Sequence, residues 1–397
     1  MVSQEYTKRT KVHFMSAKKP DYNKLALELH KKLKGKLEMK SKGKLKTKLD
    51  WSTMYTPGVA AVSSFLYKNP SQAKNYTMKG NSVAVVSDGS AVLGLGNLGA
   101  IGAMPVMEGK AAIFKEMAGI DAVPIVLDTQ EPEEIIRVVK AIAPNFGGIN
   151  LEDIAAPKCF EIEKRLKAEL DIPVMHDDQH GTAIVVLAGL INATKVVKKN
   201  LTDLKIVVLG AGAAGRAVTL LLLKADIKNI IVMDSKGAIC KGRPGMEEYK
   251  RELAEITNLE RHSGDLLQII EGADVIIGVS GPGTIAQVHI EHMAEQPIVF
   301  ALSNPIPEIM PEDARRAGAA VIATGRSDFA NQINNALAFP GVFRGALDKG
   351  IIQITDEMKL AAAKKIAGLV KKPVAENIIP SVLEPGLVKA VASAIQK

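Results

Sequence analysis

Four carboxylates occur in two short segments of the chain. Glu152 and Asp153 lie in the first segment, and Asp177 and Asp178 lie in the second. Both pairs follow apolar runs typical of β-strands, and the carboxyl ends of strands in an open α/β sheet line one crevice. Acidic groups that share a site repel one another unless a cation neutralises them, and oxygen ligands without cysteine favour Mg²⁺ or Mn²⁺ over Zn²⁺. Acidic pairs are also common on solvated surfaces. These residues alone therefore leave two alternatives open, a metal site or helix caps on the surface.

A glycine fingerprint in the second half of the chain is typical of dinucleotide binding. The segment Gly210–Gly215 reads GAGAAG, follows the apolar run 206–209 directly and opens the helix-like segment Ala213–Lys224. Its glycines permit a tight turn, a close approach of the backbone to a pyrophosphate and close packing of helix on strand. The helix N-terminus offers free N–H groups to the phosphates. We therefore predict a Rossmann-type, doubly wound dinucleotide-binding domain here.

Asp234 bears on the choice of dinucleotide. It ends the next strand-like run, at the spacing expected for the acid that binds the adenosine ribose. A carboxylate there accepts hydrogen bonds from the 2′-hydroxyl of NAD and repels the 2′-phosphate of NADP. The residues that could offset this repulsion are Ser235, Lys236, Lys241 and Lys250. NAD is the predicted cofactor, and NADP remains an alternative.

A second match to the same glycine pattern, Gly94–Gly99, has a weaker context. It follows the strand-like Ala91–Leu93, but the segment 100–109 contains Gly102, Pro105 and Gly109 and is a poor candidate for a helix. We interpret Gly94–Gly99 as a turn that shapes a substrate domain.

Short β-rich runs alternate with helical ones after the first 50 residues. The predicted strands are Ser82–Ser87, Val123–Leu127, Lys205–Leu209, Asn229–Met233, Asp274–Gly278 and Pro297–Leu302. The predicted helices include Glu131–Ile142, Gly181–Lys199, Ala213–Lys224 and Pro311–Ala317. The alternation predicts an α/β fold with parallel sheets covered by helices.

Three parts follow from this pattern. We expect an N-terminal α/β substrate and metal domain with a basic helical lead over residues 1–185, and the Rossmann-type domain over residues 186–345. Residues 346–397 are expected to form a C-terminal helical segment that packs back on the body. Within it, Thr355–Gln396 is predicted to be helical with a break at Pro373–Pro385.

Composition and charge narrow the function classes. The longest apolar stretch, Ala183–Ile191, is too short to span a bilayer, and the N-terminus shows no secretory signal. The two cysteines, Cys159 and Cys240, suggest buried free thiols in a reducing compartment, so we expect a cytoplasmic protein. Residues 1–50 hold 15 Lys/Arg and 5 Asp/Glu, whereas the remainder holds 36 and 38. We interpret this basic end as a solvated surface, with steering of an anionic substrate as an alternative, and expect no nucleic acid or membrane partner.

Several motifs, in order along the chain, together resemble the malic enzyme family. They are Tyr55–Ala60, Gly94–Gly99, Glu108–Ala111, Asn150–Ile154, His176–Thr182, Gly210–Gly215, Ala301–Pro305, Asn334–Asn335 and Phe339–Gly341. They cover about residues 50–345, and the length resembles the smaller prokaryotic form. The resemblance implies oxidative decarboxylation of L-malate to pyruvate and CO₂, with reduction of NAD or NADP and dependence on Mg²⁺ or Mn²⁺. It also implies a homodimer.

The resemblance assigns a role to individual residues. Lys110 is implied as the general base, Tyr55 as the general acid, and Asp177 as the partner of Lys110. The implied metal ligands are Glu152, Asp153 and Asp178. Asn304 and Asn335 are implied to bind the malate carboxylates. The cofactor residues are expected to be Gly210, Gly212, Ala213, Ala214, Gly215, Asp234, Ser280 and Asn304.

The chain departs from the family pattern in two places, and two other functions remain open. Ala91 stands where some larger members carry an arginine, and the first 50 residues fit the pattern poorly. One alternative is a non-decarboxylating dehydrogenase of hydroxy acids or amino acids, which would need neither the acidic cluster nor a metal. Another is a catalytically silent dinucleotide-binding protein. Release of CO₂ and sensitivity to EDTA would distinguish a malic enzyme from the first alternative. Absence of turnover with malate, Mn²⁺ and either cofactor would favour the second.

Overall fold

The computed structural model describes residues 21–92 and 94–396. The chain divides into two units, residues 1–38 and residues 39–397. In the described part of the first unit, α1 (Tyr22–Leu33) begins after Asp21, whose side chain accepts a hydrogen bond from the backbone N–H of Asn23. Residues 1–20 of the predicted basic lead, and Leu93, lie outside the described residues.

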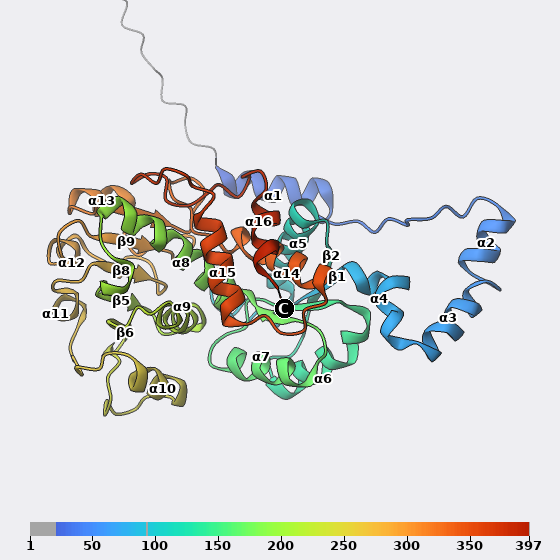
Figure 1. Cartoon of the computed structure of the whole chain (residues 1–397), viewed down its shortest axis with the longest axis horizontal. Coiled ribbons are helices and arrows are strands. Elements are labelled where there is room, and N and C mark those ends of the chain that lie inside the picture. Colours follow the sequence, from blue (N-terminus) through green and yellow to red (C-terminus); the bar gives the residue numbers. More distant parts are fainter. Residues whose placement is uncertain (1–20, 93, 397) are drawn as a thin grey trace, which may run out of the picture. The chain divides into compact units, whose positions relative to one another are not determined.

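The second unit contains a four-stranded parallel sheet with the order β2-β1-β3-β4. Its strands are β1 (Ser82–Ser87), β2 (Asp121–Val126), β3 (Gly148–Leu151) and β4 (Val174–His176). On one face, Ala84 and Val86 pack with apolar residues of α6 (Pro132–Ile142) and α7 (Lys158–Glu169). On the other face, Val83 and Val85 share a core with α5 (Gly99–Ala118) and α14 (Phe339–Lys349). The sheet is therefore covered on both sides, as its continuous apolar strands require (Figure 1).

A second sheet has six strands in the order β10-β9-β8-β5-β6-β7, and only the short β7 is antiparallel. The strands are β5 (Ile206–Leu209), β6 (Ile230–Asp234), β7 (Gly237–Ala238), β8 (Val275–Gly278), β9 (Ile298–Ala301) and β10 (Val321–Thr324). One face packs on α8 (Asp177–Val197) and α9 (Ala213–Lys224). The other face packs on α11 (Leu266–Ile270), α12 (Gln287–Glu291) and α13 (Pro311–Arg316), while α10 (Glu248–Ile256) follows β7. This doubly wound sheet confirms the predicted α/β fold class.

Helix α8 connects the two sheets and runs through the core. It begins four residues before the predicted Gly181, directly after β4, so that Asp177 and Asp178 form its first turn. Among the described residues, it is long and apolar enough to cross a membrane by length and composition alone. However, 72% of its most apolar window is buried inside the protein, which identifies it as a core helix.

The C-terminal region consists of α15 (Asp356–Ala367) and α16 (Leu387–Ala394), separated by irregular structure that includes the predicted proline-rich break. Apolar residues of both helices belong to the core that contains α8 and α14. The side-chain amide of Asn192, on α8, donates to the backbone carbonyls of Ala367 (2.8 Å) and Ile378 (3.0 Å). These bonds fix the C-terminal region to the helix that carries the acidic residues.

The expectation that residues 100–109 form a poor helix is wrong. Residues 99–118 form α5, which contains Pro105 and buries Met107, Lys110 and Phe114 against the sheet. Burial of this face outweighs the local cost of glycine and proline, because tertiary packing routinely overrides helix propensity. Ala91 and Val92 lie in a turn and not in the predicted strand.

The segment before β1 is helical but has no buried residue. It comprises α2 (Lys48–Met54), α3 (Val59–Lys68) and α4 (Ala73–Tyr76), with single 3₁₀ turns at Pro70–Gln72 and Met78–Asn81. Further 3₁₀ turns lie at Ala143–Asn145, Leu201–Asp203 and Asn335–Leu337. Figure 1 shows α2 and α3 standing clear of both sheets, so their apolar side chains are not covered within the second unit.

Candidate active site

The two acidic segments meet at the carboxyl edge of the four-stranded sheet. The last residues of β3 and β4, Leu151 and His176, are directly paired, so the residues that follow them lie side by side. Candidate ligand oxygens of Glu152, Asp153 and Asp178 all lie within 4.8 Å of one another. The backbone N–H of Asp153 donates to Asp178 Oδ2 (2.9 Å), which joins the two segments directly. The surface-cap alternative does not hold, because Glu152 and Asp153 are buried.

The chemistry of this cluster fits a hard divalent cation. Its three donors are carboxylate oxygens, which Mg²⁺ and Mn²⁺ prefer. Burial, together with the charges of Asp178 and Asp177, raises the pKa of Glu152 well above its usual range, although Lys110 opposes this shift. A bound dication would offset the cost of burying these carboxylates and the repulsion among them.

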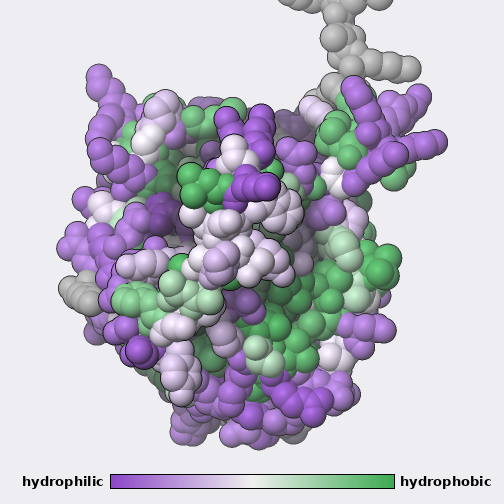
Figure 2. All heavy atoms as spheres, turned by 90° about the vertical axis from the view of Figure 1, so that its right-hand side faces the viewer, coloured by the Kyte–Doolittle hydropathy of each residue, from purple (hydrophilic) through white to green (hydrophobic). Residues whose placement is uncertain are grey.

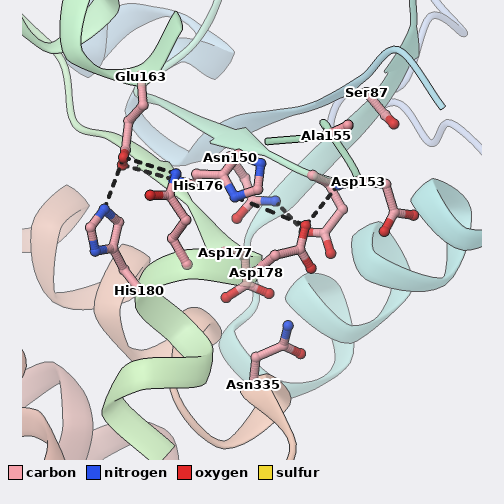
Figure 3. A network of polar contacts seen from close by, with 12 residues as sticks. Ser87, Asn150, Asp153, Ala155, Glu163, His176, Asp177, Asp178, His180 and Asn335 are labelled. Atoms are coloured by element: carbon pink, nitrogen blue, oxygen red, sulfur yellow. Dashed lines mark hydrogen bonds and ion pairs between the residues drawn. The ribbon is translucent and has the colours of Figure 1, made fainter. Parts of the chain in front are cut away.

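Lys110 reaches the same cluster from the buried face of α5. Its Nζ forms an ion pair with Asp177, lies 3.0 Å from Glu152 Oε1 and donates to Asn335 Oδ1 (3.1 Å). It also lies 4.4 Å from the ring centroid of Phe339. Burial disfavours the charged amine, but the carboxylates of Asp177, Glu152 and Asp178 outweigh it and raise the pKa of Lys110. Figure 3 shows Asn335 pointing toward this group of acidic side chains.

The glycine fingerprint lies at the switch point of the second sheet, where β5 has β6 on one side and β8 on the other. Gly210 has φ +121°, and a Cβ there would lie 2.4 Å from the carbonyl oxygen of Val279. A Cβ at Gly215 would lie 1.8 Å from the carbonyl oxygen of Gly210, so helix and strand approach too closely for a side chain. Ala213 packs against the hydrophobic core that includes Leu151 and Ile154, which flank Glu152 and Asp153 in the sequence. The helix that begins at the glycine turn therefore packs on the core beneath the sheet edge that carries the acidic cluster.

Models of two malic enzyme domains match nearly the whole chain. The N-terminal domain matches residues 34–167, and the NAD-binding domain matches residues 179–396. The chain belongs to the malic enzyme family.

Close relatives among malic enzymes agree with this membership. The bifunctional malic/malolactic enzyme of Bacillus subtilis is 53% identical over 375 residues, which cover 94% of this chain and 92% of the relative. The NAD-dependent malic enzyme of Geobacillus stearothermophilus is 57% identical over 363 residues, which cover 91% of this chain and 76% of the relative. The crystal structure of the NAD-dependent malic enzyme from Thermotoga maritima has a TM-score of 0.90 and 49% identity, covering 93% of this chain and 98% of that chain. The protein is an NAD(P)-dependent malic enzyme, a decarboxylating oxidoreductase that converts malate to pyruvate.

Asp234 of this malic enzyme is surrounded by cations. Its carboxylate accepts hydrogen bonds from Arg243 Nη1 (2.9 Å) and Nη2 (2.6 Å), and Lys250 Nζ lies 3.1 Å away. Burial would raise the pKa of Asp234, but these partners and the backbone N–H of Lys236 lower it to about 2. The arginine was not part of the predicted cofactor site, and its place in a loop after β7 explains why.

Ser280 and Asn304, two of the residues predicted to bind the cofactor, follow β8 and β9 at the same edge of the sheet. A buried acid that sequence reasoning missed, Glu308, connects their loops. It accepts hydrogen bonds from the backbone N–H groups of Ser280 (2.8 Å) and Ser303 (3.0 Å). The carbonyl oxygen of Asn304 faces Gly94, where a Cβ would approach it to 2.3 Å, so the first glycine turn meets the Rossmann-type domain.

Tyr55 is not brought to Lys110 within the described part of the chain. It lies between α2 and α3 and is 62% exposed, and Figure 1 shows these helices apart from α5, which carries Lys110. The predicted general acid and general base are therefore separated in one chain. Both cysteines are free and buried, as predicted, and neither takes part in the cluster described above.

Proposed function

We propose that Glu152, Asp153 and Asp178 bind Mg²⁺ or Mn²⁺ in this malic enzyme, and that Lys110 is the general base toward the C2 hydroxyl of L-malate. One observation supports this most strongly: a buried lysine and three candidate oxygen ligands occupy the same strand edge. A bound divalent ion supplies polarisation of the C2 oxygen and stabilisation of negative charge on it after decarboxylation.

Lys110 must be neutral to accept the hydroxyl proton as the C2 hydride passes to the nicotinamide. The carboxylates that raise its pKa are those assigned to the ion and Asp177. Once a dication shares their charge, they hold the ammonium less strongly, and burial then favours the neutral amine. Asp177 keeps the Nζ oriented through their ion pair.

The oxidised product, oxaloacetate, loses its C4 carboxylate as CO₂, and C3 must then receive a proton. Tyr55 is the proposed acid for this step. Asn335, which already contacts Lys110, and Asn304, beside the first glycine turn, are the proposed partners of the malate carboxylates.

NAD is the proposed preferred cofactor, bound at Gly210, Gly212, Ala213, Ala214, Gly215, Asp234, Ser280 and Asn304. Asp234 is ionised at pH 7 and ends β6, where it can accept hydrogen bonds from the ribose. Arg243 and Lys250 offset its charge, so discrimination against the 2′-phosphate of NADP is expected to be moderate.

A homodimer is the proposed assembly, in a cytoplasmic enzyme. The large apolar side chains of α2 and α3 are exposed: Leu49 by 70%, Trp51 by 53% and Tyr67 by 86%. Figure 2 shows hydrophobic residues gathered on the face that includes these helices. Contiguous apolar surface of this kind marks protein interaction sites, and a second copy that covers it would also bring its own Tyr55.

Initial-rate assays with L-malate test this proposal. With Mn²⁺ present, pyruvate, CO₂ and NADH are expected to form in equal amounts. The reaction is expected to stop when EDTA is added and to resume when Mn²⁺ is added in excess. The rate with NAD is expected to exceed the rate with NADP. Malate oxidation that continues undiminished after exhaustive removal of metal would contradict the assignment of Glu152, Asp153 and Asp178 as ligands.

A further inference from the structure

Glu163, on α7, is a buried carboxylate that the proposed chemistry does not use. It is 5% exposed and projects toward the end of β4. Figure 3 shows it on the opposite side of His176 from Asp153, so it lies behind the acidic cluster and not within it. A carboxylate in such a position is costly to bury unless its oxygens are fully engaged.

Both oxygens of Glu163 bind the segment that carries two acidic site residues. Oε1 accepts a hydrogen bond from the backbone N–H of His176 (3.0 Å). Oε2 contacts His180 Nε2 (2.9 Å) and accepts a weaker hydrogen bond from Gln179 Nε2 (3.4 Å). One side chain therefore holds residues 176, 179 and 180, and Asp177 and Asp178 lie between them.

The charge of Glu163 makes these contacts strong. Lys167 Nζ lies 2.7 Å from Oε1 and supplies the countercharge from the next turn of α7. Hydrogen bonds to an ionised, buried acceptor are stronger and more restrictive than neutral ones. The end of β4 and the first turn of α8 are thus fixed to α7 by a charged group.

The His176 side chain does not provide an equivalent restraint. It is fully buried, its Nδ1 lies 3.9 Å from Asp178 Oδ2, and neither ring nitrogen has a hydrogen-bond partner among the described residues. It occupies the N-cap of α8 without a side-chain capping bond. The hydrogen bond from its backbone N–H to Glu163 is therefore central to the orientation of this turn.

We propose that Glu163 is a positioning residue for metal binding. It acts through the first turn of α8, which presents Asp178 to the ion and Asp177 to Lys110. This inference rests on the metal site of the proposed function. Outer residues that orient metal ligands change metal affinity by about ten- to a hundredfold when removed, and we expect a loss in this range when Glu163 loses its charge.

Titration of the full chain with Mn²⁺ alone, followed through the electron paramagnetic resonance signal of free Mn²⁺, tests the proposal. Glu163→Gln is nearly isosteric but places an amide donor against cationic and N–H groups, so Mn²⁺ affinity is expected to fall about ten- to a hundredfold. NAD affinity, measured separately by calorimetry, is expected to stay close to that of the wild type. Glu161→Gln is the matched control, because Glu161 lies on the same helix with its side chain 59% exposed.

The outcomes separate positioning from general structural support. Unchanged Mn²⁺ affinity in a folded but less stable Glu163→Gln protein would overturn the proposal, as would equal losses of Mn²⁺ and NAD affinity. If Glu163→Gln does not fold, Lys167→Met removes the countercharge from a partly exposed position and must also weaken Mn²⁺ binding. A wild-type chain that bound NAD but no Mn²⁺ would instead refute the metal site itself, and this inference with it.

Discussion

At the scale of single residues, Lys110 faces two opposing demands. It must hold a proton to form its ion pairs with Asp177 and Glu152, and it must release that proton to act as the proposed base. The carboxylates of Asp177 and Glu152 contact the amine directly and control this balance. Glu152 is also a proposed ligand of the dication. The metal site and the base are therefore expected to depend on each other.

Lys110→Ala is expected to lower the rate of malate oxidation by about 10²- to 10⁴-fold, the usual contribution of a general base. NAD affinity should stay near the wild-type value, since Lys110 contacts the acidic cluster and not the glycine turn. Lys115→Ala is the control, because Lys115 lies on the same helix but is exposed and pairs with Asp121. Oxidation by Lys110→Ala at a rate within a few-fold of that of Lys115→Ala would exclude Lys110 as the base.

Tyr55→Phe is expected to slow pyruvate formation from malate more than it slows the reduction of oxaloacetate. The reason is that the phenol is proposed to protonate C3 after decarboxylation, whereas hydride transfer at C2 does not need it. The two half-reactions can be measured separately from NADH consumption with oxaloacetate and pyruvate release with malate. Tyr67→Phe is the control, because Tyr67 is another exposed tyrosine and lies on α3. Equal slowing of both half-reactions would remove the acid role from Tyr55.

At the scale of elements, apolar runs predicted most strands to within two residues. The strand Ser82–Ser87 and the helix Ala213–Lys224 have the predicted bounds, because each is a compact apolar run with a clear start and end. Helix α5 was not predicted, since its glycines and Pro105 conceal a buried face that only the folded sheet reveals. The partners of Asp234 also depend on tertiary structure: Arg243 reaches it from a loop whose path has no local sequence signal.

Asp234, at the end of β6, is paired with Arg243 in the loop that follows β7. This ion pair predicts a pH dependence of the free energy of unfolding. The pKa of Asp234 is about 2 in the folded protein, against 3.8 for the unfolded chain. The folded state therefore binds fewer protons, and Asp234 contributes stability above pH 4 that is lost as the pH falls through 4 toward 2. A difference of nearly two pKa units corresponds to roughly 2 kcal/mol.

Asp234→Asn should accordingly lower the thermal unfolding midpoint at pH 7 and by a similar amount at pH 5. At pH 3 the difference from the wild type should be clearly smaller. Differential scanning calorimetry of both proteins at the three pH values measures this directly. If the difference in unfolding midpoint between the two proteins were the same at pH 7 and pH 3, the charge on Asp234 would not be what holds the Arg243 loop.

At the scale of the whole molecule, the motifs indicate candidate site residues but not the residues that support them. The candidate metal ligands and Lys110 belong to motifs, whereas Glu163 and Glu308 have no motif and become visible only when distant segments meet. The position of Tyr55 is a different case. Its motif predicts a role but not a position, and the structure places it between two helices that bury nothing within their own unit.

The separation of Tyr55 from Lys110 leads to a prediction about the assembled enzyme. If two copies cover each other's α2 and α3, each Tyr55 serves the cluster of the other copy, and every active site contains residues from both chains. Tyr55→Phe and Lys110→Ala chains, coexpressed with different tags and purified as heterodimers, would then contain one site with both substitutions and one intact site. Such a heterodimer is expected to form pyruvate at about half the wild-type rate, although each homodimeric variant is nearly inactive. If both residues acted within their own chain, each site of the heterodimer would carry one damaging substitution. Its activity would then stay as low as that of the two variants, and the exchange of α2 and α3 would be refuted.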